Sequence, residues 1–302
     1  MKKILVTGSN GLLGQKLTAL IKQKGEYQLI ATSRGENRNP DKEGYDYLSF
    51  DITNEQEVNE VMKVQQPDFV INTAAMTNVD QCEEDREACW ALNVKAVSYL
   101  AKACKTYNSF LLHLSTDFIF DGKNGPYDET ATASPVSYYG ESKLAAEELL
   151  LKSDIAWAMA RTVLVYGITP NMSRSNIILW VKNSLEEKKQ IQVVNDQWRT
   201  PTLAEDLAIG CYLIVQHKAQ GIYNISGKDL LNPYQMAMQT AAYFDLDTSL
   251  IVETDGSKFS QKAKRPPKTG FILDKAIKDL GYAPVSFKEG IAVLDQQLKD
   301  LL

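Results

Sequence analysis

Tyr139 and Lys143 lie four residues apart at the start of a stretch with helical character, and Ser115-Thr116 end an apolar run upstream. Residues at this spacing share one face of a helix. A phenol of ordinary pKa, about 10, is a poor acid at neutral pH, and a neighbouring ammonium would lower that pKa. The phenol could then donate a proton to a carbonyl oxygen while hydride reaches the carbon, with Thr116 bonded to the same oxygen. The pattern predicts Thr116, Tyr139 and Lys143 as catalytic residues of a carbonyl reduction.

Three qualifications bear on this prediction. With 14 tyrosines in the chain, a Tyr and a Lys at this spacing also occur by chance, so the pair gains weight only alongside other motifs. Tyr138 is a neighbouring phenol, but it lies off that helix face and has no Lys one turn further on. His113, within the apolar run Leu111–Leu114, is interpreted as a packed core histidine rather than a catalytic one.

A glycine-rich loop follows the first apolar run of the chain. Gly8, Gly11 and Gly14 have the spacing G-x-x-G-x-x-G between a strand candidate and an amphipathic helix candidate. Glycines here would allow an unusual turn, close approach of a pyrophosphate, and tight packing of helix on strand. The helix N-terminus would offer its free N–H groups to phosphates. The alternative is an ordinary strand–helix turn with glycines for geometry alone. The predicted dinucleotide contacts in this loop are Gly8, Asn10, Gly11, Leu12, Leu13 and Gly14.

The end of the second strand candidate bears on the choice of dinucleotide. An acidic residue there would bind the ribose 2′-hydroxyl of NAD, whereas this chain has Ser33 and Arg34. A hydroxyl and a guanidinium suit a 2′-phosphate, so NADP (NADPH) is predicted, with NAD as the alternative. A solvated loop arginine is the other interpretation of Arg34. Further predicted contacts are Asp51 and Ile52 at the adenine edge, Ala74 and Ala75 after the fourth strand, and Tyr139 and Lys143.

Composition limits the other classes of function. The net charge of −5 gives no general reason to bind nucleic acid or an anionic membrane. The four cysteines form no C-x-x-C pair and there are only two histidines, so no metal site is predicted. The first apolar run breaks at Thr7-Gly8, too early for a signal peptide, and a cytoplasmic protein with reduced thiols is expected. A homodimer is compatible with the sequence.

The order of elements predicts the fold class. Short apolar runs alternate with amphipathic segments up to about Gly167, which is typical of a parallel sheet covered by helices on both faces. We therefore predict an α/β, doubly wound Rossmann fold over residues 1–167. Residues 168–302 are predicted as a smaller α/β substrate lobe, parts of which could return to the first domain. Asp255–Gly270, polar and containing Pro266-Pro267, is interpreted as a loop. The strand candidates are Lys3–Thr7, Gln28–Thr32, Tyr47–Phe50, Asp68–Asn72, Phe110–Leu114, Ile155–Val165 and Gly221–Ile225, and the helix candidates are Leu12–Lys24, Asn54–Val64, Arg86–Tyr107, Tyr138–Leu151, Asn176–Lys189, Leu203–Gln216, Pro233–Phe244 and Lys288–Leu302.

Over nearly its whole length the chain resembles the extended short-chain dehydrogenase/reductase superfamily, and within it the dTDP-4-dehydrorhamnose reductase branch. The resemblance implies NADPH-dependent reduction of the 4-keto group of a dTDP-6-deoxyhexulose, giving dTDP-L-rhamnose. Thr116, Tyr139 and Lys143 inherit the catalytic roles. The runs that carry it are Gly8–Gly14, Asp51–Thr53, Asn72–Ala75, Val79-Asp80, Ser115–Gly122 with Pro126-Tyr127, Asp196-Gln197 with Pro201-Thr202, Asp206–Ala208 and Gly221–Asn224.

Substrate contacts are assigned to Thr116, Asp117 and Phe118 within that signature. Arg199 and Arg265 are assigned to the same site as basic residues that could hold a diphosphate, with Lys268 as a third candidate. Solvated surface charge is the alternative for these three cations.

The chain departs from the branch at several positions. Leu164 stands where these reductases usually have a Trp that helps to line the sugar site, and Arg199 stands where a small residue is common. The spacing from Arg265-Pro266 to Leu273-Asp274 is two residues longer than usual. Some members hold magnesium at a dimer interface through a glutamate where this chain has Lys16, so no such metal is predicted. The departures at Leu164, at Arg199 and in the spacing after Arg265 leave the exact sugar open.

Two other functions remain as alternatives. A nucleotide-sugar dehydratase of this superfamily would carry an acidic residue after Thr-Asp, where Phe118 stands, and an epimerase would show an Asn-containing run that Thr162–Gly167 lacks. The second alternative is a dinucleotide-binding regulatory subunit without turnover, like that of methionine adenosyltransferase. The intact Thr116, Tyr139 and Lys143 argue against it.

Overall fold

The computed structural model describes residues 1–170, 175–258 and 262–300 and is built on a seven-stranded sheet. Every pairing in this sheet is parallel, in the order β10-β6-β5-β4-β1-β2-β3. Its central strands are buried on both faces, which explains their continuous apolar sequences. The strands are β1 (Lys3–Thr7), β2 (Gln28–Ser33), β3 (Asp46–Ser49), β4 (Phe69–Asn72), β5 (Phe110–Thr116), β6 (Trp157–Thr162) and β10 (Gly221–Asn224).

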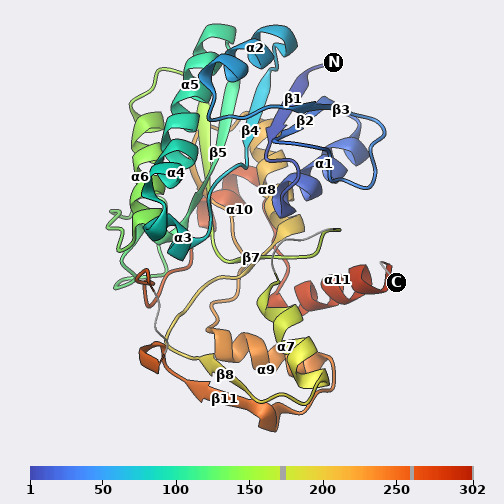
Figure 1. Cartoon of the computed structure of the whole chain (residues 1–302), viewed down its shortest axis with the longest axis vertical. Helices are drawn as coiled ribbons and strands as arrows, with labels where there is room; N and C mark the ends of the chain where they lie inside the picture. The colour runs from blue at the N-terminus through green and yellow to red at the C-terminus, as the bar shows by residue number, and fades with distance from the viewer. Residues whose placement is uncertain (171–174, 259–261, 301–302) are drawn as a thin grey trace.

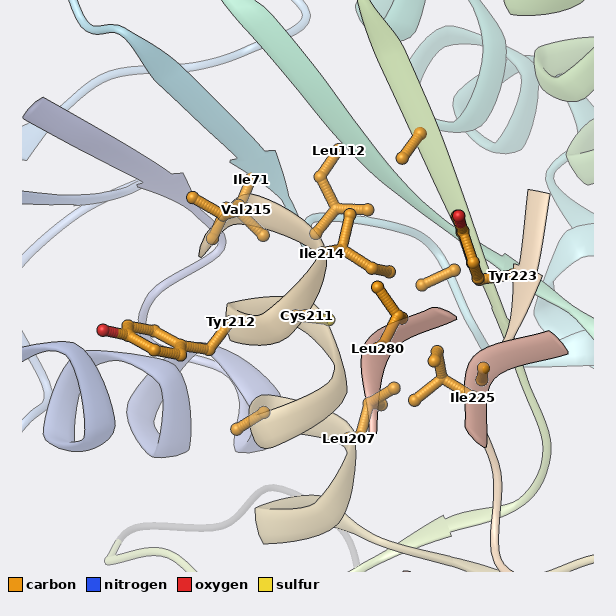
Figure 2. Close-up of a cluster of buried hydrophobic side chains, with 14 of the residues drawn as sticks. Ile71, Leu112, Leu207, Cys211, Tyr212, Ile214, Val215, Tyr223, Ile225 and Leu280 are labelled. Carbon is orange, nitrogen blue, oxygen red and sulfur yellow. The ribbon is translucent and has the colours of Figure 1, made fainter. Parts of the chain in front are cut away.

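Helices cover both faces of the sheet (Figure 1). On one face, α1 (Leu12–Lys24), α8 (Ala204–His217) and α10 (Asp274–Leu280) enclose a core that includes Ile71 and Leu112. Figure 2 shows the apolar side of α8 against these strands. The other face is covered by α2 (Glu55–Gln65), α5 (Ala96–Tyr107) and α6 (Tyr138–Leu151). These helices enclose Val70 and Leu111, the residues just before Ile71 and Leu112 in the same strands. The predicted α/β Rossmann architecture is confirmed.

The strand order reverses direction between β1 and β4, in the middle of the sheet. The chain runs from β1 outward to β2 and β3, then returns to form β4 on the other side of β1. Loops that leave the carboxyl ends of β1 and β4 therefore diverge, and ligands of doubly wound sheets bind at this point. Gly8 follows β1, and Ala74 follows β4.

The chain beyond residue 167 contributes to two parts of the molecule. β10 extends the main sheet beside β6, and α8 and α10 pack on it. A separate lobe lies below the carboxyl edge in Figure 1. It contains α7 (Ile177–Glu186), α9 (Pro233–Tyr243) and two paired short strands, β8 (Ile191–Val194) and β11 (Ile251–Thr254), which the sequence did not predict. Between these parts lie β7 (Val165–Tyr166), its partner β9 (Thr202–Leu203), and α11 (Phe287–Asp300).

Two local differences from the predicted elements affect the site. The helix expected over Arg86–Tyr107 is α4 (Arg86–Trp90), a π-helical turn (Ala91–Lys95) and α5 in succession. A short helix before it, α3 (Val79–Glu84), was not predicted, although Asn78 caps it by accepting from Gln81 N. The loop predicted over Asp255–Gly270 contains one short 3₁₀ turn (Gly256–Lys258), and its residues 259–261 lie outside the described residues. No helix among the described residues is long and apolar enough to cross a membrane.

Candidate active site

The glycine loop packs against the start of the segment that follows β4. Gly8 has φ +70°, and a Cβ there would lie 2.8 Å from Ala74 N. A Cβ on Gly14 would lie 2.3 Å from the carbonyl oxygen of Gly8. Both positions therefore exclude any side chain, as expected for a tight turn and for a helix packed closely on its strand.

The same loop leaves the start of α1 available to an anion. The first hydrogen bond of the helix runs from Gln15 N to Gly11 O at 2.9 Å. The N–H groups of Leu12, Leu13 and Gly14 precede it and point out of the helix end, where the helix dipole favours negative charge. A Cβ on Gly11 would meet nothing closer than Gly8 O at 3.3 Å. The cradle therefore fits the pyrophosphate of a dinucleotide.

The predicted dinucleotide-selecting residues lie together at the ends of β2 and β3. Arg34 is 84% exposed, and its Nη1 lies 3.6 Å from Asp51 Oδ2. Asp51 also accepts hydrogen bonds from the backbone and the hydroxyl of Thr53. Asn10 binds the backbone of the loop after β2 on both sides, donating to Glu36 O at 2.8 Å and accepting from Arg38 N at 2.8 Å. Asn10 thus orients the loop that presents Arg34.

Tyr139 is placed at the carboxyl edge of the sheet by the N-terminus of α6. Ser137 caps this helix by accepting from Gly140 N at 3.2 Å. The Tyr139 side chain is 8% exposed and packs edge-to-face on Phe118, with ring centroids 5.7 Å apart. Burial raises the pKa of Tyr139 above its ordinary value, and the nearby Thr116 hydroxyl opposes this rise. Desolvation is the largest of these effects, and the lowering of this pKa by Lys143 stays a prediction.

Lys143, one helix turn after Tyr139 on α6, is buried, with 2% exposure. Its Nζ donates to Leu114 O at 2.6 Å and lies 3.1 Å from His113 Nε2. Burial lowers the pKa of Lys143 to about 8, against the attraction of Glu147 and Cys89. Beside it, Cys89 lies 3.4 Å from Ser142 Oγ and 3.4 Å from Asn93 Nδ2, and contacts with Cys82 and these two groups lower its pKa to about 7. The four cysteines are all buried, and none of them forms a disulfide in the described part of the chain.

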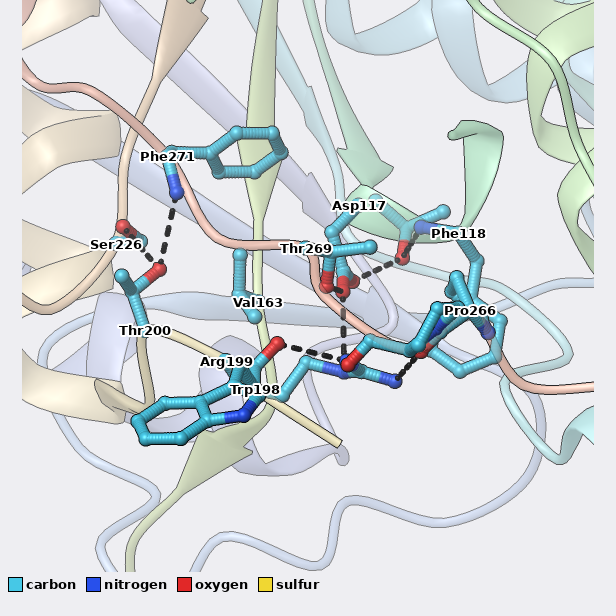
Figure 3. A network of polar contacts seen from close by, with 12 residues as sticks. Asp117, Phe118, Val163, Trp198, Arg199, Thr200, Ser226, Pro266, Thr269 and Phe271 are labelled. Atoms are coloured by element: carbon cyan, nitrogen blue, oxygen red, sulfur yellow. Dashed lines mark hydrogen bonds and ion pairs between the residues drawn. The ribbon is translucent and has the colours of Figure 1, made fainter. Parts of the chain in front are cut away.

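Thr116, the last residue of β5, begins a polar network that reaches the C-terminal part of the chain (Figure 3). Its hydroxyl donates to Asp117 Oδ1 at 3.1 Å. The other carboxylate oxygen, Oδ2, accepts from the Thr269 hydroxyl and lies 3.5 Å from Arg199 Nε. Burial raises the pKa of Asp117, and Arg199 and the two hydroxyls oppose this rise. Phe118 N donates back to Thr116 Oγ1 at 3.3 Å.

The cations predicted to hold the diphosphate have different environments. Arg199 is 5% exposed, and its terminal nitrogens donate to Trp198 O and Pro266 O, each at 2.7 Å. Arg265 makes a bidentate ion pair with Asp80, with Nη1 3.0 Å from Oδ1 and Nη2 2.8 Å from Oδ2. This contact lowers the pKa of Asp80 to about 2. The structure thus gives both arginines internal partners. Lys268 is half-buried in the same segment, and no carboxylate pairs with it among the described residues.

Sequence reasoning missed three residues of this region. Asp80 and Thr269 come from segments far apart in the chain, and only the fold shows that they tie residues 263–269 to α3 and to β5. His113 was interpreted as a packed core residue; it is 1% exposed, but it contacts Lys143. The sequence did contain a signal for this role. His113 stands two residues before Ser115 in the same strand, and alternate residues of a strand share a face of the sheet. Lys16, where a metal-binding glutamate was considered, lies 2.7 Å from Glu205.

With this geometry in place, comparison with known proteins is informative. Residues 1–299 match the family described as the RmlD substrate binding domain. The chain belongs to this family. A dTDP-4-dehydrorhamnose reductase from Aggregatibacter actinomycetemcomitans is 31% identical over 306 residues, covering 96% of this chain and 97% of that protein. Methionine adenosyltransferase 2 subunit beta from Danio rerio is 30% identical over 270 residues, covering 88% and 81% of the two chains.

A solved structure agrees with this assignment. The dTDP-4-dehydrorhamnose reductase from Bacillus anthracis in complex with NADP has a TM-score of 0.86 and 25% identity, covering 98% of this chain and 100% of that one. The family and the oxidoreductase class predicted from the sequence are confirmed.

Proposed function

We propose that this member of the RmlD family is an NADPH-dependent reductase of a nucleotide-linked 4-keto-6-deoxy sugar, converting dTDP-4-dehydrorhamnose to dTDP-L-rhamnose. The observation that carries the proposal is the placement of Thr116 beside the Tyr139 hydroxyl at the carboxyl end of β5, with Lys143 bonded to Leu114 O of the same strand and the glycine loop after the neighbouring β1. The NADP-bound Bacillus anthracis reductase supports the choice of dinucleotide.

The residues around the glycine loop would hold the pyrophosphate, the 2′-phosphate and the adenine of NADPH. Gly8, Gly11 and the N-terminus of α1 would hold the pyrophosphate, with Asn10 ordering the neighbouring loop. Ser33 and Arg34 would hold the 2′-phosphate, and Asp51 and Ile52 would meet the adenine edge. The backbone of Ala74 and Ala75 would pass close to the nucleotide. NADPH supplies a hydride when bound; the protein supplies the proton and the orientation of the sugar.

The chemical roles follow from the environments of three side chains. Tyr139 is buried and protonated at neutral pH, as a general acid for the 4-keto oxygen must be before the reaction. Lys143 carries a positive charge one helix turn after Tyr139. This charge would stabilise the phenolate left on Tyr139 after proton transfer. Thr116 presents a hydroxyl that can orient the same carbonyl oxygen. Asp117 accepts a hydrogen bond from this hydroxyl, and Phe118 packs on the Tyr139 ring.

One assay separates this proposal from its alternatives. Purified protein is incubated with NADPH and dTDP-4-keto-6-deoxy sugars, and NADPH oxidation and the sugar product are measured. We expect stoichiometric oxidation with formation of a 6-deoxy-L-sugar. Absence of NADPH oxidation with every keto sugar would favour the regulatory-subunit alternative, for which the similarity to methionine adenosyltransferase 2 subunit beta is the supporting observation. Substrate turnover without net NADPH oxidation would favour an epimerase or dehydratase.

The remaining partner and assembly predictions stay part of the proposal. The acidic net charge of −5 supports the absence of a nucleic-acid or membrane partner, and the cytoplasmic location stays a prediction. Light scattering of the purified chain would test the homodimer.

A further inference from the structure

Lys143 and His113 meet inside the protein, at the junction of α6 and β5. The ammonium nitrogen lies 3.1 Å from His113 Nε2 and 2.6 Å from Leu114 O. Both side chains are almost fully buried, with exposures of 2% and 1%. An ammonium has three N–H donors, and a buried charged group needs partners for them. Two of the three are therefore directed into the protein, which leaves one for the nucleotide crevice.

The imidazole is itself fixed from the other side. His113 Nδ1 lies 3.1 Å from Asn72 Nδ2, and Asn72 Oδ1 accepts from the Thr7 hydroxyl at 2.6 Å. Asn72 and Thr7 are the last residues of β4 and β1, the two strands whose loops diverge at the crevice. A chain of polar side chains thus runs from the start of the glycine loop to Lys143. It crosses three adjacent strands of the sheet.

Electrostatics determine which state the imidazole takes. Burial and the charge of Lys143 hold the pKa of His113 well below its ordinary value. A neutral imidazole has one acceptor nitrogen and one donor nitrogen. Beside a charged Lys143, the acceptor is Nε2 and Nδ1 carries the hydrogen. Nδ1–H donates to Asn72 when the amide is turned by 180°, which brings Oδ1 to His113 and lets Nδ2 donate to the Thr7 hydroxyl. Leu114 O supplies a second acceptor, so the ammonium is held by two fixed groups.

We propose that His113 is a positioning residue for the reduction, with its Nε2 accepting a hydrogen bond from Lys143 and fixing the direction of the one ammonium N–H left for the site. This inference rests on the role proposed above for Lys143. A core histidine that only filled space would require the volume of the ring and not an acceptor at Nε2. Cys89 and Glu147 are the other titratable groups that act on Lys143, and Glu147 is already paired with Arg161 at 2.6 Å.

Two substitutions separate the acceptor from the ring. In His113→Gln the amide can reach the place of Nε2, whereas in His113→Asn it reaches only the place of Nδ1, toward Asn72. We expect His113→Asn to lower kcat/KM for NADPH by about tenfold or more, the usual effect of losing a hydrogen bond to a charged group. We expect His113→Gln to recover most of that loss. His217→Asn, a change at the exposed second histidine, is the matched control with no effect.

The pH profile gives a readout that a merely structural histidine would not change. Losing the acceptor disfavours the charged form of Lys143, so the basic limb of kcat/KM should move to lower pH in His113→Asn and return toward its normal position in His113→Gln. Equal profiles for wild type and His113→Asn would overturn the proposal. So would equal damage in the two variants, because the acceptor would then be irrelevant.

A measurement on the unaltered protein covers the case in which a variant fails to fold. The chain has two histidines, so ¹⁵N-histidine labelling gives two imidazole spin systems, distinguished by His217→Asn. We expect the buried ring to stay neutral with Nε2 unprotonated from pH 5 to pH 7. A protonated Nε2 in that range contradicts the inference. Failure of the proposed function would look different, since the wild-type protein itself would then not reduce any 4-keto sugar.

Discussion

Arg34 and Asp51 face each other at the ends of β2 and β3, with 3.6 Å between guanidinium Nη1 and carboxylate Oδ2. The guanidinium is otherwise in solvent, with 84% of its side chain exposed, so the pair is weak and can open. A 2′-phosphate would compete with Asp51 for Arg34. We therefore expect the selection of the dinucleotide to depend on this exposed cation and its neighbouring anion.

The first prediction follows from this pair. Arg34→Ala should weaken NADPH binding by about 1–3 kcal/mol, the range of a charge-assisted contact, and leave NADH binding unchanged. Binding is measured by quenching of protein fluorescence with each nucleotide. Lys102→Ala removes another exposed cation, which pairs with Glu55 at 3.0 Å on the outer helices, and is the control. Equal losses for both nucleotides, or a wild-type preference for NADH, would contradict the assignment.

The second prediction concerns the proton donor. Tyr139→Phe keeps the ring that packs on Phe118 and removes only the hydroxyl. Turnover should fall by about a hundred- to ten-thousandfold, while NADPH affinity should barely change. Thr116→Val should cost less, because it removes orientation of the carbonyl and not the proton. A Tyr139→Phe protein with near-normal reduction of the keto sugar would rule out this mechanism and direct attention to Tyr138.

The third prediction is the pH dependence of the reaction. Burial lowers the pKa of Lys143 to about 8, so the side chain is largely charged at neutral pH and loses its charge as pH rises through that value. We expect kcat/KM for NADPH, which reports the free enzyme, to fall as pH rises through about 8. Lys143→Met should lose both turnover and NADPH affinity and show no such limb. Stability should change in the opposite direction. The folded state releases the Lys143 proton at lower pH than the unfolded state, so the free energy of unfolding should rise as pH increases from about 8 toward the ordinary lysine pKa of 10.5.

The comparison of sequence and structure shows which inferences local pattern can support. The Gly8 to Gly14 loop and the Tyr139 to Lys143 pair were predictable because each lies within one strand–helix unit, where spacing determines geometry. The internal partners of Arg199 and Arg265 were not, because Asp117 and Asp80 lie more than eighty residues away. When the sequence does not show which carboxylate pairs with an arginine, that arginine is predicted to be available to a ligand. The Lys143 contact with His113 has the same cause, since it forms only when α6 packs on β5.

The fourth prediction is that Arg199 stabilises the fold rather than binding the diphosphate directly. Arg199→Met leaves Asp117 buried without its cation and frees the carbonyls of Trp198 and Pro266. Breaking a buried pair in this way should cost about 3–5 kcal/mol of unfolding free energy, measured by urea denaturation. Lys105→Met breaks an exposed pair with Asp154 and should leave stability unchanged. Wild-type stability of Arg199→Met, together with a raised substrate KM, would return Arg199 to the substrate site.

The last prediction assigns the diphosphate to Lys268. This residue lies in the segment that Arg265 ties to Asp80 and that Thr269 ties to Asp117, so its backbone is held at the edge of the site while its ammonium has no paired carboxylate among the described residues. Lys268→Met should raise the KM for the nucleotide sugar severalfold and leave both kcat and NADPH affinity unchanged, because the lost contact is uniform binding far from the reacting carbonyl. Lys264→Met, an exposed lysine four residues earlier in the same segment, is the matched control and should have no effect. Steady-state kinetics at saturating NADPH measures both variants. If Lys268→Met keeps the wild-type KM, or if Lys264→Met raises it equally, the diphosphate is bound by other groups and this segment serves only to close the site.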